Sequence, residues 1–277
     1  MKIPVSVIIL TYNEELNLEN CLKSISNWAS EIFIVDSYST DKTLAIAKKY
    51  NCKIIQHAFA NQAKQFNWAL DNLEIKNNWI LRLDADEYLT EELKNEITEK
   101  LKNVAPDING FYIKRRIYFM NRWIKHAGVY PLWLLRLFKY GKGKSELKEI
   151  DEHIVLLEGR AGELKNDFIH DDKKDLYWWT QRHNDYSTRE VETILNLKPE
   201  IAALGGQPGR KRWLKEKFYY RLPLFWRAFF YFHYRYFFCL GFLDGKQGLI
   251  YHFLRVCWYR FLLDAKIYEY RKKSEKD

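Results

Sequence analysis

Two carboxylates with a spacing that suits metal binding follow a hydrophobic stretch in the first third of the chain. Residues 79–83 are mostly apolar, and Asp84, Ala85 and Asp86 come directly after them. In an extended backbone, residues i and i+2 point the same way, so Asp84 and Asp86 could converge on one divalent cation. Mg²⁺ and Mn²⁺ prefer oxygen ligands, and a substrate diphosphate could supply the others. The alternative interpretation is an acidic turn that caps a helix beginning near Thr90.

The elements that would position these acids alternate along the first hundred residues. We predict strands at 4–10, 31–36, 53–57 and 79–84, and helices at 15–26, 41–50 and 61–73. Such alternation is typical of a parallel sheet, which binds ligands at the carboxyl edge of its strands. Residues 11–14, 36–37 and 84–86 would meet at that edge. The sequence has no glycine-rich dinucleotide or P-loop motif, so we expect a metal to hold the phosphates.

Composition and charge divide the chain into two parts. It has 277 residues, 47% of them hydrophobic, which excludes a disordered protein. The spacing of the four scattered cysteines fits neither a disulfide framework nor a zinc site. The apolar run at the N-terminus is too short for a signal peptide. We therefore expect a protein of the cytoplasm. Residues 210–277 carry 16 basic and 6 acidic side chains, whereas the rest of the chain is nearly neutral.

The basic tail also contains 22 of the 46 aromatic residues. Arginine and lysine interrupt every window that is long enough for a transmembrane helix. A basic, aromatic segment of this kind suits the bilayer interface, so we favour a helical foot on the membrane surface. One alternative is a helical subdomain whose aromatic side chains pack internally. Single-stranded nucleic acid is a weaker alternative that the upstream motifs do not support, and we expect no nucleic acid partner.

The chain resembles the family 2 glycosyltransferases, which have the GT-A fold. Three motifs in the matching order carry the resemblance: residues 7–14 resemble the opening strand and nucleotide loop, 34–41 the second strand end, and 83–87 the D-x-D motif. A finer resemblance is to bacterial transferases that build lipopolysaccharide core or exopolysaccharide repeat units. It rests on residues 29–41, 59–70 and 241–248.

This resemblance implies roles for residues at the strand ends. Thr11, Tyr12, Glu14, Asp36, Gln65 and Asp84 would bind the nucleotide-sugar donor, with Asp36 on the base. Asp84 and Asp86 would also hold Mn²⁺ or Mg²⁺. Judged from the residues alone, Tyr12 could instead be a core aromatic and Asp36 a cap for the following turn.

Inverting transfer also needs a base that takes the proton of the acceptor hydroxyl, and a carboxylate is the usual choice. In similar enzymes this base lies beyond the D-x-D motif, where Asp151 and Glu152 form the most compact acidic candidate. We favour Glu152 because the corresponding acid in similar transferases ends a short run of this kind. Two solvated acids after a basic stretch are the alternative.

Three further residues could complete the site. His170 ends another short apolar stretch, and the resemblance implies a histidine in such a place as a metal ligand; imidazole suits Mn²⁺ better than Mg²⁺. A purely structural histidine is the alternative. Arg115 and Arg136 are candidates for contacts to the diphosphate or to an anionic acceptor, although they could equally be solvated charges.

Together these features predict an α/β protein with a GT-A mixed sheet, helices on both faces and a basic, aromatic helical tail. We expect a nucleotide-sugar half at 1–100, an acceptor-binding half at 101–205 and the tail at 206–277. The predicted activity is inverting transfer from a nucleotide-diphosphate sugar, UDP-linked, to a lipid-linked glycan at the cytoplasmic face of the membrane. Transfer to a polyprenyl phosphate and a non-catalytic nucleotide-binding scaffold are the alternatives.

Overall fold

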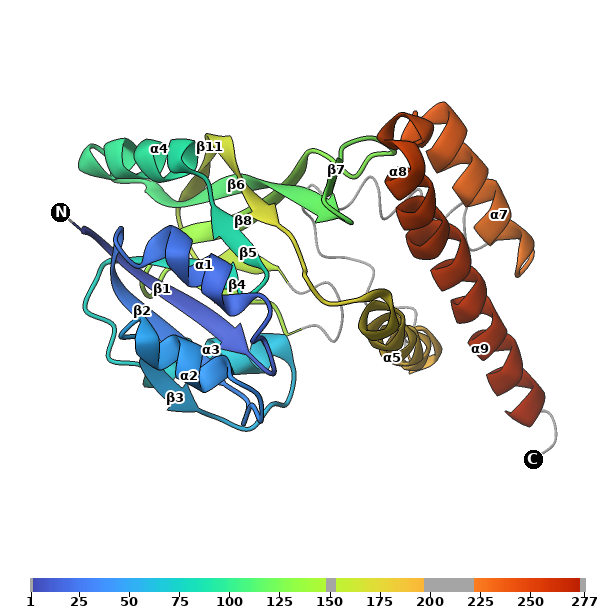
Figure 1. Cartoon of the computed structure of the whole chain (residues 1–277), viewed down its shortest axis with the longest axis horizontal. Helices are drawn as coiled ribbons and strands as arrows, with labels where there is room; N and C mark the ends of the chain where they lie inside the picture. Colours follow the sequence, from blue (N-terminus) through green and yellow to red (C-terminus); the bar gives the residue numbers. More distant parts are fainter. Residues whose placement is uncertain (1, 148–152, 197–221, 275–277) are drawn as a thin grey trace. The chain divides into compact units, whose positions relative to one another are not determined.

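A computed structural model describes residues 2–147, 153–196 and 222–274, so Asp151, Glu152 and the predicted boundary at 206 lie outside the described residues (Figure 1). The chain divides into two compact units. The first comprises Met1–Lys125 and Val129–Lys174, and the second His126–Gly128 and Asp175–Asp277. The longer segment of the second unit begins at Asp175, and the predicted division at 100 and 205 stays a prediction.

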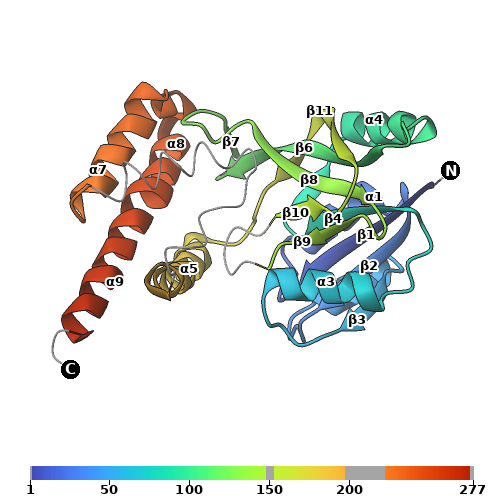
Figure 2. The ribbon, with the colours of Figure 1, turned by 180° about the vertical axis from the view of Figure 1, so that it is seen from behind.

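One mixed sheet organises the first unit. Its strands run in the order β3-β2-β1-β4-β8-β6-β11-β5, with β7 paired to β6, and β9 and β10 form a separate pair (Figure 2). The strands are β1 (Ile3–Thr11), β2 (Ala29–Asp36), β3 (Lys53–Gln56), β4 (Trp79–Asp84), β5 (Glu87–Leu89), β6 (Ile108–Phe119), β7 (Arg122–Ile124), β8 (Leu132–Lys139), β9 (Gly143–Ser145), β10 (Ile154–Leu156) and β11 (Arg160–His170). The predicted parallel part is confirmed for β3, β2, β1 and β4. Beyond β4, antiparallel β8 makes the sheet mixed.

Hydrophobic side chains cover both faces of this sheet. On β1, Val7 and Ile9 belong to one core cluster and Ile8 to another, because successive strand residues point to opposite faces. The helices of this unit are α1 (Leu18–Ile25), α2 (Thr43–Lys49), α3 (Gln62–Asn72) and α4 (Glu91–Lys102). Residues of α1, α2 and α4 join the first cluster and residues of α3 the second. Strands β1, β2 and β4 are therefore buried on both faces, and the polar side chains at their carboxyl ends lie at the edge.

The predicted elements of the first hundred residues all exist, with ends shifted by up to three residues. The helix expected near Thr90 is confirmed as α4, and the Thr90 hydroxyl accepts a hydrogen bond from the Leu93 amide at 3.2 Å. One premise was wrong. Strand β4 ends at Asp84, and Ala85 and Asp86 form a turn, so the two acids do not share an extended backbone.

The second unit is helical. It contains α5 (Leu176–Asn196), α7 (Trp226–His233), the π-helical η3 (Tyr234–Phe238), the 3₁₀ turn η4 (Gly241–Asp244), α8 (Gly245–His252), the π-helical η5 (Phe253–Trp258) and α9 (Tyr259–Ser274). Its core cluster is small: Val191, Leu263 and Ile267, with Ile194 and Leu195 packed against them. Many aromatic side chains lie on its surface instead. Among the described residues, no helix is both long and apolar enough to cross a membrane.

Candidate functional site

The end of β4 carries a buried network of charges. One guanidinium nitrogen of Arg136, on β8, lies 2.8 Å from Oδ2 of Asp84 and 2.8 Å from Oε1 of Glu87. The Asp84 amide also donates to Oε2 of Glu87 at 3.0 Å. Burial acts to raise the pKa of Asp84, but Arg136 and Arg82 outweigh it and lower that pKa below its ordinary value. Asp84 is thus an ionised carboxylate held in place by arginine.

Glu87 responds differently to the same surroundings. Its side chain is fully buried, and this burial raises its pKa, with the nearby charge of Asp84 adding to the rise against the attraction of Arg136. Sequence reasoning did not single out Glu87. Its position directly after Asp86 was the one signal in the sequence. The strand that it begins, β5, has only three residues and is too short to be recognised by periodicity.

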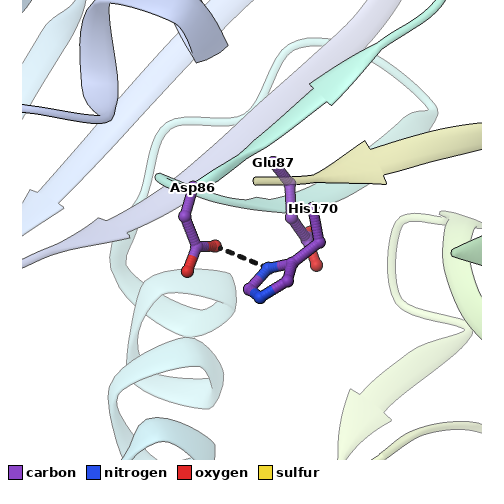
Figure 3. A group of neighbouring side chains, drawn as sticks. All are labelled: Asp86, Glu87 and His170. Carbon is purple, nitrogen blue, oxygen red and sulfur yellow. Dashed lines mark ion pairs between the residues drawn. The ribbon is translucent and has the colours of Figure 1, made fainter. Parts of the chain in front are cut away.

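Strand pairing brings a histidine from far along the sequence to this point. In the antiparallel ladder of β5 and β11, His170 lies opposite Glu87, and directly opposite residues point to the same face. The Asp171 amide donates to the Asp86 carbonyl at 2.9 Å, which extends the pairing by one step. As a result, Nδ1 of His170 lies 3.3 Å from Oδ1 of Asp86, and Figure 3 shows the carboxylate facing the imidazole ring.

These groups fit a divalent cation. One ligand atom from each of Asp86, Glu87 and His170 lies within 4.8 Å of the others. Burial acts to lower the pKa of His170, but the Asp86 carboxylate raises it above its ordinary value. Nδ1 of His170 is buried and is paired with Asp86 at 3.3 Å, so a cation bound between the two would take the place of the imidazole proton. Carboxylate oxygen together with imidazole suits Mn²⁺.

Arg115 and Arg136, the candidates for contacts to the diphosphate or the acceptor, both belong to this charge network. Arg136 is 6% exposed and is held by Asp84 and Glu87, so the structure shows it positioning carboxylates. Arg115, on β6, lies 3.7 Å from Oε1 of Glu87, and its Nε is buried without a hydrogen bond within the described residues. Contacts of either arginine to a diphosphate or an anionic acceptor stay a prediction.

Three residues predicted to bind the nucleotide-sugar donor are buried at or near the ends of β1 and β2: Thr11, Asp36 and Gln65. The Thr11 hydroxyl donates to Asp36 at 2.9 Å, and the Ser39 amide donates to the other Asp36 oxygen at 2.9 Å. Asp36 is fully buried, which is the arrangement of a cap for the following turn. The side-chain nitrogen of Gln65, on α3, donates to the Ser37 hydroxyl at 3.2 Å and to the His57 carbonyl at 3.1 Å. These side chains shape the edge, and their direct contact with a nucleotide stays a prediction.

Tyr12 is not a core residue. Its side chain is 59% exposed, so the core alternative was wrong. Tyr38, which sequence reasoning missed, is 57% exposed at the end of the neighbouring strand. The loops that carry the two rings are bonded together, because the Asn13 amide donates to the Ser39 hydroxyl and the Thr40 amide to the Asn13 side chain, both at 2.9 Å. The edge thus presents two exposed tyrosines from adjacent strands.

Glu14 ties this edge to the segment after β11. Its carboxylate lies 2.7 Å from Nζ of Lys174 and accepts a hydrogen bond from Asn17 at 2.9 Å. Asn17 also donates to Asp172 at 2.9 Å. Burial raises the pKa of Glu14 against the attraction of Lys174. Lys174 and Asn17 were missed by sequence reasoning, since neither forms a recognisable motif.

The catalytic candidates Asp151 and Glu152 lie outside the described residues. The strand-end acids lie in a part of the chain that matches a known protein family. The family described as Glycosyl transferase family 2 matches residues 6–155, more than half of the chain. The chain belongs to glycosyl transferase family 2. Asp84, Asp86 and the two loops at the ends of β1 and β2 all lie inside the matched region of this family 2 member.

Individual relatives agree with this assignment. The lipopolysaccharide core biosynthesis glycosyltransferase LpsC of Rhizobium meliloti is 28% identical over 283 residues, which cover 97% of this family 2 chain and 93% of LpsC. An uncharacterized glycosyltransferase of Rickettsia bellii is 40% identical over 93 residues, 34% of this chain and 31% of that relative. The second alignment therefore spans about a third of its relative.

Two solved structures resemble the family 2 chain at a low level. The 1–349 segment of S. aureus TarS is 17% identical with a TM-score of 0.47, covering 99% of this chain and 92% of that one. The glucosyl-3-phosphoglycerate synthase of Mycobacterium tuberculosis, in complex with Mn²⁺, UDP and its product, is 19% identical with a TM-score of 0.34, covering 41% and 44%. These similarities are too low to place a ligand.

Proposed function

We propose that this chain is an inverting, metal-dependent glycosyltransferase that moves a sugar from a UDP-linked donor to a lipid-linked glycan of the lipopolysaccharide core. The observation that carries the proposal is the pair formed by Asp86 and His170, with ligand atoms 3.3 Å apart. It lies at the carboxyl end of β4, the edge at which parallel strands bind ligands. The relationship to LpsC over 97% of the chain supports the core glycan as the product.

Asp86 and His170 would hold the Mn²⁺ or Mg²⁺, with Asp84 and Glu87 behind them on Arg136. When bound, the ion would offset the charge of the leaving nucleoside diphosphate. The contacts of each carboxylate indicate which of them would bind the ion. Arg136 pairs with both Asp84 and Glu87, whereas the Asp86 carboxylate faces the His170 imidazole 3.3 Å away, so the cation would bind between Asp86 and His170.

The nucleotide would lie against the ends of β1 and β2. Tyr12 and Tyr38 are exposed there, and an exposed ring offers a surface on which a base can stack. Thr11, Asp36 and Gln65 would fix the loops that carry these rings through the buried hydrogen bonds already described. Preorganised loops bind with a smaller loss of conformational entropy.

Glu152, or Asp151 next to it, would take the proton from the acceptor hydroxyl as it attacks the anomeric carbon opposite the departing nucleotide. A lipid-linked acceptor would place the enzyme at the cytoplasmic face of the membrane, as a peripheral protein.

The test is nucleotide release by the purified protein from a panel of nucleotide sugars in the presence of Mn²⁺ and a lipid-linked core acceptor. We expect a UDP-sugar to be consumed with stoichiometric transfer of its sugar. Undiminished function in cells after replacement of both Asp84 and Asp86 would instead identify a scaffold. Full transfer after loss of both Asp151 and Glu152 would favour a polyprenyl phosphate acceptor, which is ionised already.

A further inference from the structure

Exposed aromatic side chains form one continuous face along α7 and η3. They recur at spacings of three and four residues, which places them on one side of a helix. These residues, here called the aromatic stripe, are Trp226, Phe229, Phe230, Tyr234, Phe237 and Phe238. Their exposed fractions run from 42% for Phe229 to 80% for Phe238. Figures 1 and 2 both show α7 beside the long run of α8, η5 and α9 in the same unit.

The opposite side of the same helix is charged and buried. Arg227 is 3% exposed and Asp264 of α9 is fully buried. Nε of Arg227 donates to both Asp264 oxygens, at 2.8 and 2.9 Å, and the Phe225 amide donates to Asp264 at 2.8 Å. A helix in water turns its apolar side to the protein core. Here the ion pair faces inward and the apolar side outward, so this helix is suited to an apolar surrounding.

Within residues 222–264, which contain the stripe, no carboxylate is exposed. Asp244 and Asp264 are the only acidic residues between positions 222 and 264, and both are buried. Asp244 accepts hydrogen bonds from the His126 amide at 3.0 Å and from its ring at 2.7 Å. Lys246 and Arg255 are exposed in the same range. The exposed charge of this region is therefore positive, which complements an anionic surface.

An apolar tip follows the stripe at the turn between η3 and α8. Leu240, Phe242 and Leu243 are 44–48% exposed there. The turn is fixed by hydrogen bonds from the Leu243 amide to the Leu240 carbonyl at 3.1 Å and from the Ala127 amide to the Cys239 carbonyl at 2.8 Å. Leu240 has φ +61°, a left-handed conformation in which glycine is relaxed and leucine is strained. The fold thus places an exposed leucine where its backbone would prefer glycine.

A groove opens beside the stripe. It has a volume of about 350 Å³ and is lined by Phe225, Trp226, Phe229 and Phe261, all aromatic. A groove with such walls has the indole N–H of Trp226 as its one hydrogen-bonding side-chain group and otherwise suits a hydrocarbon chain.

We propose that the aromatic stripe and the apolar tip insert into the acyl-chain boundary of an anionic lipid bilayer, with one lipid chain in the groove. Aromatic rings are favourable at headgroup depth, and the exposed cations meet the lipid phosphates. The inference deepens the proposed function and rests on it for the membrane as the place of the acceptor. Lipid binding itself is measured without donor or acceptor.

The experiment is flotation of the full chain with vesicles of phosphatidylcholine, with and without phosphatidylglycerol. The test variants are Phe238→Ser and Leu240→Gly. Tyr177→Ser is the matched control, because Tyr177 lies on α5 of the same unit and is also 80% exposed. Thermal unfolding midpoints check the fold, and the midpoint of Leu240→Gly should equal or exceed that of the wild type because its backbone strain is relieved.

We expect the wild type and Tyr177→Ser to float with phosphatidylglycerol vesicles, and each test variant to bind roughly tenfold more weakly, since one buried apolar side chain is lost. Unchanged flotation of both test variants would overturn the proposal, as would a wild type that does not float. A lipid-free dimer that dissociates in Phe238→Ser would also overturn it, since a second copy would then cover the stripe. Stripe-dependent flotation without turnover of any nucleotide sugar would uphold this inference while the proposed function fails.

Discussion

The two units of this protein differ in how much of their apolar surface they bury. In the first unit, two clusters of 23 and 11 buried residues cover the faces of the sheet, and the buried charges gather at the carboxyl end of β4. Among the described residues of the second unit, the core cluster has three buried members, an ion pair is buried, and many aromatic rings are exposed. The first unit has the apolar core that stabilises a protein in water. The second leaves much of its apolar surface for another surrounding.

The surroundings of the buried charged side chains also differ between the units. Asp84, Glu87 and Arg136 lie beside Asp86 and His170, whose ligand atoms could hold a cation, whereas Arg227 and Asp264 pair with one another and Asp264 also accepts from the Phe225 amide. We therefore expect substitutions in the first unit to affect turnover most, and substitutions in the second to affect stability and surface binding. Four predictions test this division.

The largest effect should follow Asp86→Ala. Loss of a direct metal ligand removes several kcal/mol of charge stabilisation, so we expect turnover to fall by roughly 10³-fold while the fold is kept. Steady-state nucleotide release and calorimetric Mn²⁺ titration measure the change. Glu91→Ala, on the exposed start of α4, is the matched carboxylate control. Wild-type turnover that survives EDTA would show that no metal is used.

Glu152→Gln should come next. Glutamine keeps the shape of the side chain but cannot accept a proton, so transfer should fall by about 10²- to 10⁴-fold, the usual contribution of a general base. Affinity for the nucleotide diphosphate with Mn²⁺ should change little, and calorimetry measures it separately. Should Asp151→Asn abolish transfer while Glu152→Gln does not, the base is Asp151.

Arg227→Leu should act on stability. It leaves Asp264 buried without its partner, which costs about 3–5 kcal/mol of the free energy of unfolding. The double variant Arg227→Leu with Asp264→Leu removes both charges and should recover most of this loss. Urea unfolding followed by circular dichroism measures both variants. A single variant as stable as the wild type would contradict a closely packed ion pair in this unit.

The smallest effect concerns pH. Burial, with the positive charge of Arg255, lowers the pKa of His183 from 6.5 to about 3. Protonation therefore favours the unfolded chain: this cost is absent above pH 6.5 and grows as the pH falls toward 3. Thermal midpoints between pH 7 and 4 should decline less steeply in His183→Gln, whereas His233→Gln, at an exposed position, should follow the wild type. Parallel declines in all three proteins would contradict the lowered pKa.

Local patterns predicted the first hundred residues well because each element carries its own signal. Strands of continuous apolar residues and helices with apolar residues at helical spacing were found to within three positions. The short strands β5, β7, β9 and β10, of three residues each, were not predicted. A three-residue strand has no measurable period, and its existence depends on the strand that pairs with it.

The sequence by itself determined the family, the parallel part of the sheet and the acids at its edge. Motif order and hydrophobic periodicity are local properties, and they survive without knowledge of the fold. Only the tertiary structure decided which side chains the acids contact. Pairing of β5 with β11 joins Asp86 to His170, and β8 brings Arg136 to Asp84. It also decided that Tyr12 is exposed and that α7 turns its aromatic side outward. These outcomes depend on contacts between residues far apart in the chain, which no local pattern encodes.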